Sequence, residues 1–457
     1  MTFYDGIARQ VMAPAYDLVR GTHTMQCLRE LEESQWWPLE RILELQSRRL
    51  ARLVEHAYVR VPHYRRVMDE RGIVPSDIRT AADLAALPVL TRSYIQEHGS
   101  DLIAEGFPRR RMRVTRTSGS TGHPLRFYST REDQVDHGYA RNIRALEWAG
   151  LRLGDRTVGI ARPREYGNRQ DRYLKDLSRR FKRHISIDVD SLSDRNLPLI
   201  VALLSSERVV GLRGYPNAVA LLAASIKDSG LPAPEIRSVV TGAGELLGHQ
   251  RALIREVFGT EPYSKYSSFE VYEIACECGA HAGLHVAAED VVVEVVDDKG
   301  NPVPPGVEGT IVVTNLHNYA MPFIRYELGD NGTLLDGDCP CGRALPRLGS
   351  LVGRKNMWLV SRSGRRIAFG TLFLDRLAEL GMRQCQVVQE TVESVVVRVI
   401  PPPTLTQQER VLLPRKVRSM LGPILGDEFA LHVEFVERIE PTEAGKHVYV
   451  VSKISTV

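Results

Sequence analysis

Apolar residues recur along the N-terminal part of this chain with the period of a helix. Between about residues 35 and 75 they come every three to four positions, and Pro62 marks a break between two helical stretches. The positions that set this period are Leu39, Ile42, Leu43, Leu45, Leu50, Leu53 and Val54. We therefore expect a helical region over roughly residues 1–90.

From about residue 155 onward, the pattern changes to short runs rich in valine and isoleucine that alternate with helical windows. The runs that predict strands are 157–161, 184–189, 209–213 and 236–241, and the helical windows between them include 218–227 and 247–258. This alternation predicts a sheet with helices packed on its faces. Two further runs, 291–296 and 310–314, are expected to form an antiparallel pair.

The pattern changes again after Gly353-Arg354, where short strands and two helices are expected. The roughly 100 residues that remain are enough for a small domain of their own. We predict an α/β protein with a large, multi-sheet N-terminal α/β domain over residues 1–353. A hinge at 354–357 and a small C-terminal α+β domain at 358–457 are expected to follow.

Composition and charge exclude several classes of protein. With 457 residues, of which 43% are hydrophobic, the chain can bury a large core. Its 60 basic and 56 acidic residues are interspersed, and the run 109–111 of three arginines reads as a solvated loop edge, so we expect no nucleic-acid partner. No apolar run approaches the roughly 18 residues of a membrane helix, and Asp5 and Arg9 interrupt the position of a signal peptide. No membrane contact and a cytoplasmic location are expected.

Four of the six cysteines form two Cys-x-Cys pairs, Cys276 with Cys278 and Cys339 with Cys341. In a reducing compartment such pairs favour a metal over disulfides, and zinc prefers thiolate and imidazole ligands in a tetrahedron. Residues 276–285 also contain two histidines, so the segment offers more ligands than one metal needs.

Residues 117–124, with the sequence TSGSTGHP, have the composition of a phosphate-binding loop. Glycines let backbone N–H groups converge on an anion, and hydroxyl groups add donors without bulk. A P-loop would need lysine and then serine or threonine after Gly122, whereas this chain has His123 and Pro124, so it is not a P-loop NTPase. A surface turn is the alternative. The residues of this candidate loop are Thr117, Ser118, Gly119, Ser120, Thr121 and Gly122.

Six motifs, in order, resemble those of the adenylate-forming superfamily of acyl- and aryl-CoA synthetases and luciferases. They are TSGSTGHP, Ala243-Gly244-Glu245, the segment 266–270, RYELGD at 325–330, Gly353-Arg354, and a lone lysine in the loop 441–446. The chain is similar, more narrowly, to the phenylacetate-CoA ligase branch and its relatives found near capsular polysaccharide genes. This narrower resemblance rests on the segments 62–65, 87–92 and 339–343.

The resemblance implies a ligase that uses ATP and Mg²⁺ to activate a small-molecule carboxylic acid as an acyl-adenylate. The acyl group would then pass to a thiol, that of coenzyme A or of a carrier protein. Two alternatives stay open. One is an adenylate-forming ligase that ends on an amine or another non-thiol nucleophile, or that activates a non-carboxylate acid. The other is a non-catalytic, zinc-stabilised binding module, against which the presence of Lys446, Glu270 and Asp330 argues.

The resemblance also implies a role for each motif. Residues 117–122 would hold the β- and γ-phosphates, Glu270 would hold Mg²⁺, and Lys446 would bridge the carboxylate and the α-phosphate as they react. The adenine pocket would include Gly244, Glu245 and Tyr266; Asp330 and Arg354 would bind the ribose; and Tyr215, Gly242 and Ala243 would border the acyl pocket. Because Lys446 lies in the C-terminal domain, that domain is expected to be mobile about residues 354–357.

For the metal, the resemblance selects Cys278, His285, Cys339 and Cys341 as the ligands of a structural zinc, with Cys276 or His281 as substitutes for one of them. The chain departs from the family pattern at two positions. Phe269 stands where the family has a threonine near the phosphates, which puts the affinity for ATP in question. Asn356 stands where the family hinge has an aspartate, which puts the domain rotation in question.

Overall fold

The structure is a computed structural model that describes most of the chain. The described residues are 3–116, 125–161, 183–193, 195–206, 209–354, 358–363, 366–368, 377, 380, 382–402, 404–426, 428–441 and 447–454. The described chain divides into two compact units. Unit 1 consists of residues 1–155 and 263–351, and unit 2 of residues 156–262 and 352–457. The predicted domain boundary at residue 354 stays a prediction.

Unit 1 begins with helices. They are α1 (Phe3–Ile7), the π-helix Ala8–Met12, α2 (Ala13–Arg20), α3 (Thr24–Ser34), α4 (Leu39–Arg60), α5 (Pro62–Arg71) and α6 (Arg92–His98), and, after a strand pair, the π-helix Glu132–His137 and α7 (Gly138–Trp148). The predicted helical region and its break are confirmed, because Pro62 is the first residue of α5, where its missing N–H costs nothing. Of the apolar positions that set the predicted period, Ile42, Leu50, Leu53 and Val54 of α4 are fully buried, whereas Leu39 and Leu43 are exposed.

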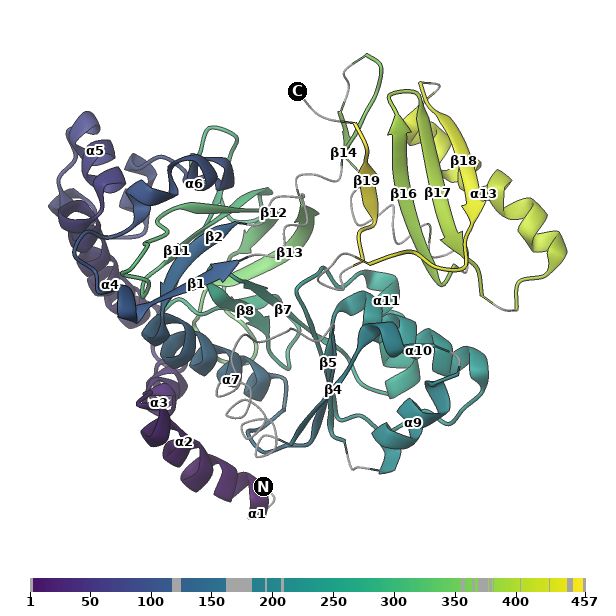
Figure 1. Ribbon diagram of the computed structural model, residues 1–457, viewed down its shortest axis with the longest axis horizontal. Coiled ribbons are helices and arrows are strands. Elements are labelled where there is room, and N and C mark those ends of the chain that lie inside the picture. The colour runs from purple at the N-terminus through teal and green to yellow at the C-terminus, as the bar shows by residue number, and fades with distance from the viewer. Residues whose placement is uncertain are drawn as a thin grey trace. The chain divides into compact units, whose positions relative to one another are not determined.

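The main sheet of unit 1 is largely antiparallel. Its strands are β7 (Tyr263–Ser268), β8 (Tyr272–Glu277), β9 (Leu284–Val286), β10 (Val291–Val296), β11 (Gly309–Asn315), β12 (Tyr326–Leu335) and β13 (Arg347–Arg354), in the order β10-β11-β12-β13-β9-β8-β7 (Figure 1). The predicted antiparallel pair is confirmed, since Val291 pairs with Asn315. A separate hairpin joins β1 (Met112–Arg116) to β2 (Arg126–Thr130). Helix α7 packs on β8, and α3 packs on α7.

Unit 2 contains the predicted strand–helix alternation. Its parallel strands are β3 (Thr157–Ile160), β4 (His184–Ile187), β5 (Gly211–Gly214) and β6 (Ser238–Gly242), in the order β6-β5-β3-β4. The helices α9 (Leu197–Ser206), α10 (Pro216–Ser229) and α11 (Gly248–Phe258) lie beside them (Figure 1). These strands and helices share one core of aliphatic side chains. This part therefore has the α/β character that the sequence predicted.

The C-terminal part of unit 2 has a second core of its own. A four-stranded sheet has the order β18-β17-β16-β19 and is formed by β16 (Gln384–Thr391), β17 (Ser394–Ile400), β18 (Ala430–Phe435) and β19 (Val450–Ser452). Helix α13 (Gln407–Leu425) packs on β18 and begins at a capping box, in which Thr406 and Glu409 bond to each other's backbone N–H groups. A short hairpin joins β14 (Trp358–Val360) to β15 (Arg366–Ala368). The expected α+β character is present.

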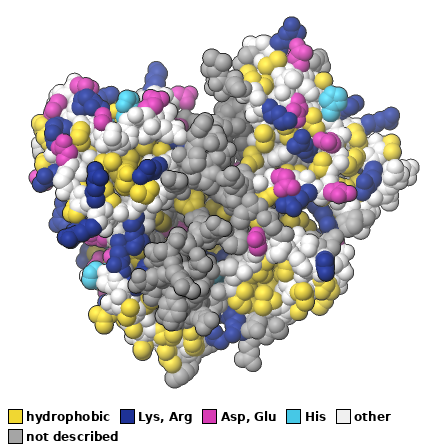
Figure 2. All heavy atoms as spheres, viewed as in Figure 1, with side chains coloured by type: hydrophobic (Ala, Val, Ile, Leu, Met, Phe, Trp, Pro, Cys, Tyr) yellow, Lys and Arg dark blue, Asp and Glu magenta, His cyan; other side chains and the backbone are white. Residues whose placement is uncertain are grey.

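Charge and hydropathy on the described surface agree with the composition. Basic and acidic side chains are interspersed over the face seen in Figure 2. The arginine run Arg109–Arg111 forms a short exposed helical turn, as expected of a solvated loop edge. Among the described residues, no helix combines the length and the apolar character needed to cross a membrane.

Candidate functional site

Three of the residues expected to bind ATP and Mg²⁺ come together within unit 1. Tyr266 near the end of β7 donates a hydrogen bond from its hydroxyl to Oδ2 of Asp330 on β12, at 2.9 Å. Glu270 lies in the turn after β7, and its Oε1 accepts a hydrogen bond of 3.2 Å from the hydroxyl of Tyr326, also on β12. Strand β12 thus carries Asp330, which is expected at the ribose, and Tyr326, which contacts Glu270, the residue expected at the metal.

The carboxylate of Glu270 is buried, with only 6% of the residue exposed. Burial raises the pKa of Tyr326, and the negative charge of Glu270 raises it further, so this phenol stays a hydrogen-bond donor. The guanidinium of Arg92, the first residue of α6, lies with Nη1 at 3.9 Å from Oε1 of Glu270. No role for this arginine was expected from the sequence.

Arg325 precedes Tyr326 and holds the start of β12 in place. It is buried, adopts a positive φ of 53°, and donates from Nη2 to Oε1 of Glu294 at 2.9 Å and from Nη1 to the carbonyl of Leu87 at 2.6 Å. Its own carbonyl accepts from the N–H of Leu90 at 2.9 Å. This arginine of the RYELGD motif therefore acts on the site by fixing the backbone, a role that residue type alone does not reveal.

The motif at residues 62–65 contributes in the same way. The hydroxyl of Tyr64 donates to the carbonyl of Pro322 at 2.8 Å and accepts from the N–H of Ile324 at 3.0 Å. Burial of this tyrosine excludes water from both bonds. Tyr64 therefore braces the segment that leads into Arg325 and connects two motifs that are far apart in the sequence.

Unit 2 brings together the residues expected at the acyl pocket. Gly242 ends β6 and is followed by Ala243, which adopts a positive φ of 60° that side chains other than glycine rarely adopt. Tyr215 follows the neighbouring strand β5. Gly244 lies against Pro216, because a Cβ added there would be 3.5 Å from the proline ring. In parallel sheets, ligands bind at the carboxyl ends of the strands, where these residues and Glu245 lie.

Several expected site residues cannot be located in this way. The phosphate-loop residues Thr117, Ser118, Gly119, Ser120, Thr121 and Gly122 lie outside the described residues, and so does Lys446. The hinge residues 355–357 are also outside them, and Arg354 is described only as the last residue of β13. The assignments of these residues stay predictions.

The structure brings all four expected zinc ligands together. One ligand atom from each of Cys278, His285, Cys339 and Cys341 lies within 4.8 Å of all the others. The two buried thiols of Cys278 and Cys339 are 3.7 Å apart, and Sγ of Cys341 is 3.2 Å from Nε2 of His285. A tetrahedral zinc with Zn–S bonds of about 2.3 Å needs sulfur atoms about 3.8 Å apart, so these residues fit zinc.

The two substitute ligands lie elsewhere. Sγ of Cys276 contacts the carbonyl of Ala145 at 3.6 Å, and Nδ1 of His281 lies 3.3 Å from a carboxylate oxygen of Glu277. Burial lowers the pKa of His285 to about 4, which keeps this imidazole neutral as metal binding requires. Its Nδ1 faces the carbonyl of Leu345 at 3.4 Å, which leaves Nε2 for the metal.

The loop that carries Cys339 and Cys341 also contacts the N-terminal helices. Nε of Arg343 donates to Oε1 of Gln35 at 2.9 Å. The guanidinium of Arg343 lies over the ring of Trp36 at 4.4 Å and over that of Trp148, the last residue of α7, at 5.2 Å. The cysteine cluster is therefore next to the contact between the sheet and its helical layer.

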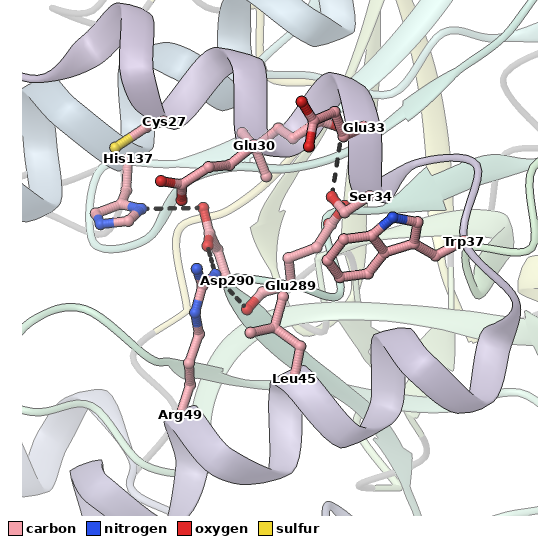
Figure 3. A pocket seen from close by; sticks show the side chains of 11 residues that line it. Cys27, Glu30, Glu33, Ser34, Trp37, Leu45, Arg49, His137, Glu289 and Asp290 are labelled. Carbon is pink, nitrogen blue, oxygen red and sulfur yellow. Dashed lines mark hydrogen bonds and ion pairs between the residues drawn. The ribbon is translucent and has the colours of Figure 1, made fainter.

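Unit 1 contains a second cluster of potential metal ligands that was not expected from the sequence. His137, Asp290 and His317 also offer ligand atoms within 4.8 Å of one another. Asp290 and its neighbour Glu289 border a pocket of about 180 Å³ between α3, α4 and the start of β10 (Figure 3). The signal in the sequence was the pair of consecutive acids directly before the apolar run 291–296.

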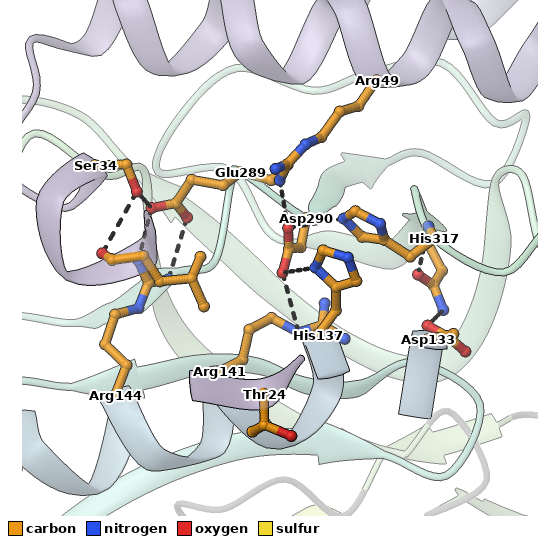
Figure 4. A network of polar contacts seen from close by, with 12 residues as sticks. Thr24, Ser34, Arg49, Asp133, His137, Arg141, Arg144, Glu289, Asp290 and His317 are labelled. Atoms are coloured by element: carbon orange, nitrogen blue, oxygen red, sulfur yellow. Dashed lines mark hydrogen bonds and ion pairs between the residues drawn. The ribbon is translucent and has the colours of Figure 1, made fainter. Parts of the chain in front are cut away.

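Arginines surround this second cluster (Figure 4). Asp290 is fully buried, with Nη1 of Arg49 at 2.5 Å from Oδ1 and Nε of Arg141 at 3.8 Å from Oδ2. Glu289 accepts two bonds from Arg144, at 2.6 and 3.1 Å. Because these guanidinium groups already balance the carboxylates, an added metal cation would be repelled. The cluster therefore reads as an ion-pair network that ties α3, α4 and α7 to β10.

No protein-family model matches the chain. The chain is 30% identical over 340 residues to the phenylacetate-coenzyme A ligase of Thermus thermophilus, covering 72% of this chain and 74% of that protein. It is 27% identical over 342 residues to the phenylacetate-coenzyme A ligase of Aromatoleum evansii, covering 73% and 75%. A crystal structure of 2-hydroxyisobutyryl-CoA ligase in the postadenylation state shares the fold, with a TM-score of 0.73 and 20% identity over 92% of this chain and 91% of that one.

Proposed function

The chain belongs to the phenylacetate-coenzyme A ligase family, and on that premise we propose that it activates a carboxylic acid with ATP and transfers the acyl group to the thiol of coenzyme A. One observation carries the proposal. Asp330 accepts a hydrogen bond from Tyr266, and Tyr326 donates one to Glu270. Asp330 and Tyr326 lie on the same strand, β12. These contacts connect the aromatic ring of Tyr266 with two carboxylates, and we take Asp330 as the ribose acceptor and Glu270 as the ligand of Mg²⁺.

The nucleotide would be bound by groups of complementary chemistry. The carboxylate of Asp330 would accept hydrogen bonds from the ribose hydroxyls, and its bond with Tyr266 orients the ring for stacking on adenine. Gly244 and Glu245 would line the adenine pocket, and Arg354 would lie beside the ribose. Donors in residues 117–122 would hold the β- and γ-phosphates.

The reaction brings a carboxylate to a phosphorus atom that is already surrounded by negative charge. Glu270 offers hard oxygen ligands to Mg²⁺, which neutralises phosphate charge when it is bound. Lys446 would place its ammonium between the acid and the α-phosphate, which lowers the repulsion as the two approach. Tyr215, Gly242 and Ala243 would border the acid. The departing pyrophosphate would leave an acyl-adenylate, and the thiol would then attack its acyl carbon to form the thioester and release AMP.

A structural zinc is the second part of the proposal. Cys278, His285, Cys339 and Cys341 would supply all four ligands of a tetrahedral ion. A site with four protein ligands has no open position for a substrate, so its contribution would be to stability. Because Arg343 of the same loop contacts Gln35, the ion would also hold the helical layer on the sheet.

A pyrophosphate-release screen over aryl, fatty and amino acids, with and without coenzyme A, tests the function. We expect release with at least one acid, a thioester only when coenzyme A is present, and loss of adenylate formation in Lys446→Ala with nucleotide binding retained. The matched control is Lys453→Ala, which changes an exposed lysine of the same unit. If the acyl group is transferred to an amine, the proposed acceptor, coenzyme A, is wrong. If no acid causes pyrophosphate release, the proposed activity is contradicted.

The assembled nucleotide residues are tested by Asp330→Asn. The amide accepts hydrogen bonds more weakly than a carboxylate, so we expect the KM for ATP to rise about tenfold, the effect of losing one charge-assisted bond. Asp298→Asn, the same change at an exposed aspartate of unit 1, serves as the control and should leave the KM within about twofold.

A further inference from the structure

The segment 87–92 was singled out in the sequence, yet the proposed reaction gives no role to its last residue, Arg92. The backbone fixes where this arginine begins. The N–H of Leu90 donates to the carbonyl of Arg325 at 2.9 Å, and the carbonyl of Leu90 accepts from Glu327 at 3.0 Å. Thr91 then caps α6 by accepting from the N–H of Tyr94 at 3.3 Å. The backbone just before Arg92 is therefore hydrogen-bonded to Arg325 and Glu327, the residues on either side of Tyr326.

From that position the side chain of Arg92 reaches Glu270. Its Nη1 is 3.9 Å from the same Oε1 that accepts the hydrogen bond from Tyr326. The side chain of Glu270 is 8% exposed and that of Arg92 is 32% exposed. The carboxylate is thus held inside the protein beside an arginine whose side chain is partly exposed.

A carboxylate in this position needs a counter-charge whether or not a metal is bound. A buried charge without a partner is strongly unfavourable, and a guanidinium within about 4 Å supplies the missing partner. A metal ion that binds the same carboxylate would come close to the guanidinium and be repelled by it. Binding of Mg²⁺ to Glu270 therefore weakens the contact between Arg92 and Glu270, and the presence of Arg92 weakens the binding of Mg²⁺.

We propose that Arg92 is the charge partner of Glu270 in the metal-free protein and competes with Mg²⁺ for this carboxylate. Arg92 thereby sets the Mg²⁺ concentration at which the ligase becomes active. The inference rests on the proposed function in one respect, since it takes Glu270 as the metal ligand. Because the side chain of Arg92 is partly exposed, it can turn away from Glu270 when the metal binds, and Tyr326 keeps the carboxylate in place.

The test is the concentration of free Mg²⁺ that gives half of its effect at saturating ATP, measured in two ways: as the Mg²⁺-dependent rise in melting temperature without acid, and as pyrophosphate release with saturating acid. In Arg92→Gln we expect this concentration to fall about fivefold, the size of effect given by a partly exposed ion pair. Arg92→Lys keeps the charge and should stay close to the parent protein. Arg71→Gln, the same change at an exposed arginine of α5 whose Nη1 donates to the carbonyl of Ala86, is the matched control. Thermal unfolding of each variant establishes that it is folded.

The outcomes separate the inference from the proposed function. Glu270→Gln should raise this concentration of free Mg²⁺ at least tenfold, because an amide binds Mg²⁺ poorly. If Glu270→Gln raises it and Arg92→Gln leaves it unchanged or raises it, the competition is overturned and the metal ligand stands. If Glu270→Gln leaves it unchanged, the assignment of the metal ligand is wrong and the competition falls with it. Should Arg92→Gln not fold, Arg92→Met, which keeps the aliphatic stem, gives the same test.

Discussion

Unit 1 contains two clusters of metal-ligating side chains that look alike by distance and differ in charge. In each cluster, the potential ligand atoms lie within 4.8 Å of one another. The cysteine cluster joins Cys278 and His285 to Cys339 and Cys341. The acidic cluster joins Asp290 to His137 and His317. Proximity alone would assign a metal to both.

The neighbours of each cluster decide between the two readings. Three cysteines that bind a metal become thiolates, and a divalent cation is what balances such a set. Asp290 already has Arg49 at 2.5 Å and Arg141 at 3.8 Å, so its charge is balanced without a metal. The comparison teaches that a metal site is recognised by the charge its ligands leave uncompensated as much as by their spacing.

Removing the zinc ligands should have the largest effect. In the double variant Cys278→Ser and Cys339→Ser, we expect bound zinc to fall from one per chain to none and the free energy of unfolding to drop by about 5 kcal/mol or more, since metal binding contributes directly to folding. Metal analysis and thermal unfolding measure both. Cys276→Ser, at a buried cysteine outside the cluster, is the control and should keep its zinc. A parent protein that purifies with far less than one zinc per chain would remove the distinction between the clusters.

Neutralising the acidic cluster should come next. Asp290→Asn leaves Arg49 and Arg141 without their buried partner, so we expect a loss of about 3–5 kcal/mol in the free energy of unfolding. The zinc content should not change. Asp298→Asn, at an exposed aspartate, should change stability by less than about 0.5 kcal/mol. Loss of a bound metal from Asp290→Asn would break the comparison, because it would make the acidic cluster a metal site.

The acidic cluster should also make the protein sensitive to acid. Burial lowers the pKa of His317 to about 4, so the folded state holds this histidine neutral. Its contribution to stability is complete above the unfolded pKa of about 6.5 and is lost as the pH falls toward 4, up to about 3 kcal/mol. In His317→Gln, which keeps an N–H donor for Asp290, denaturant unfolding between pH 7 and 4 should show a shallower loss. His98→Gln, at an exposed histidine, is the control, and an equal change there would refute the assignment.

The smallest effect is expected at the edge of the cysteine cluster. Arg343→Ala removes the bond to Gln35 and the stacking on Trp36 and Trp148, for a loss of about 1–2 kcal/mol. Bound zinc should remain at one per chain, because Arg343 is not a ligand. Arg362→Ala, at an arginine whose side chain is 78% exposed, controls for the loss of charge. Zinc loss in Arg343→Ala alone would show that the helical layer is needed to form the site.

The local pattern of the chain predicted much of the fold, and the family resemblance supplied the residues of the candidate site. The helical period predicted α4 and α5, and the valine-rich runs predicted β10, β11 and the strands of unit 2, because both signals come from residues close in sequence. The motif residues Tyr266, Glu270 and Asp330 were also expected to share a site. The contacts of Arg325, Tyr64 and Arg92 were not expected, since nothing in a lone arginine or tyrosine tells which distant backbone it will meet.

By itself, the sequence determined which chemical groups the protein has and in which kind of element each one lies. Cys276, Cys278, His281 and His285 were all eligible as metal ligands on that basis. The family resemblance selected Cys278 and His285 among them, together with Cys339 and Cys341, and the tertiary structure brings these four together. Only the tertiary structure decided that Glu289 and Asp290 meet arginines. The physical reason is that helices and strands form according to the pattern of residues close in sequence. The balance of buried charge depends instead on groups that packing brings together from more than 100 residues away.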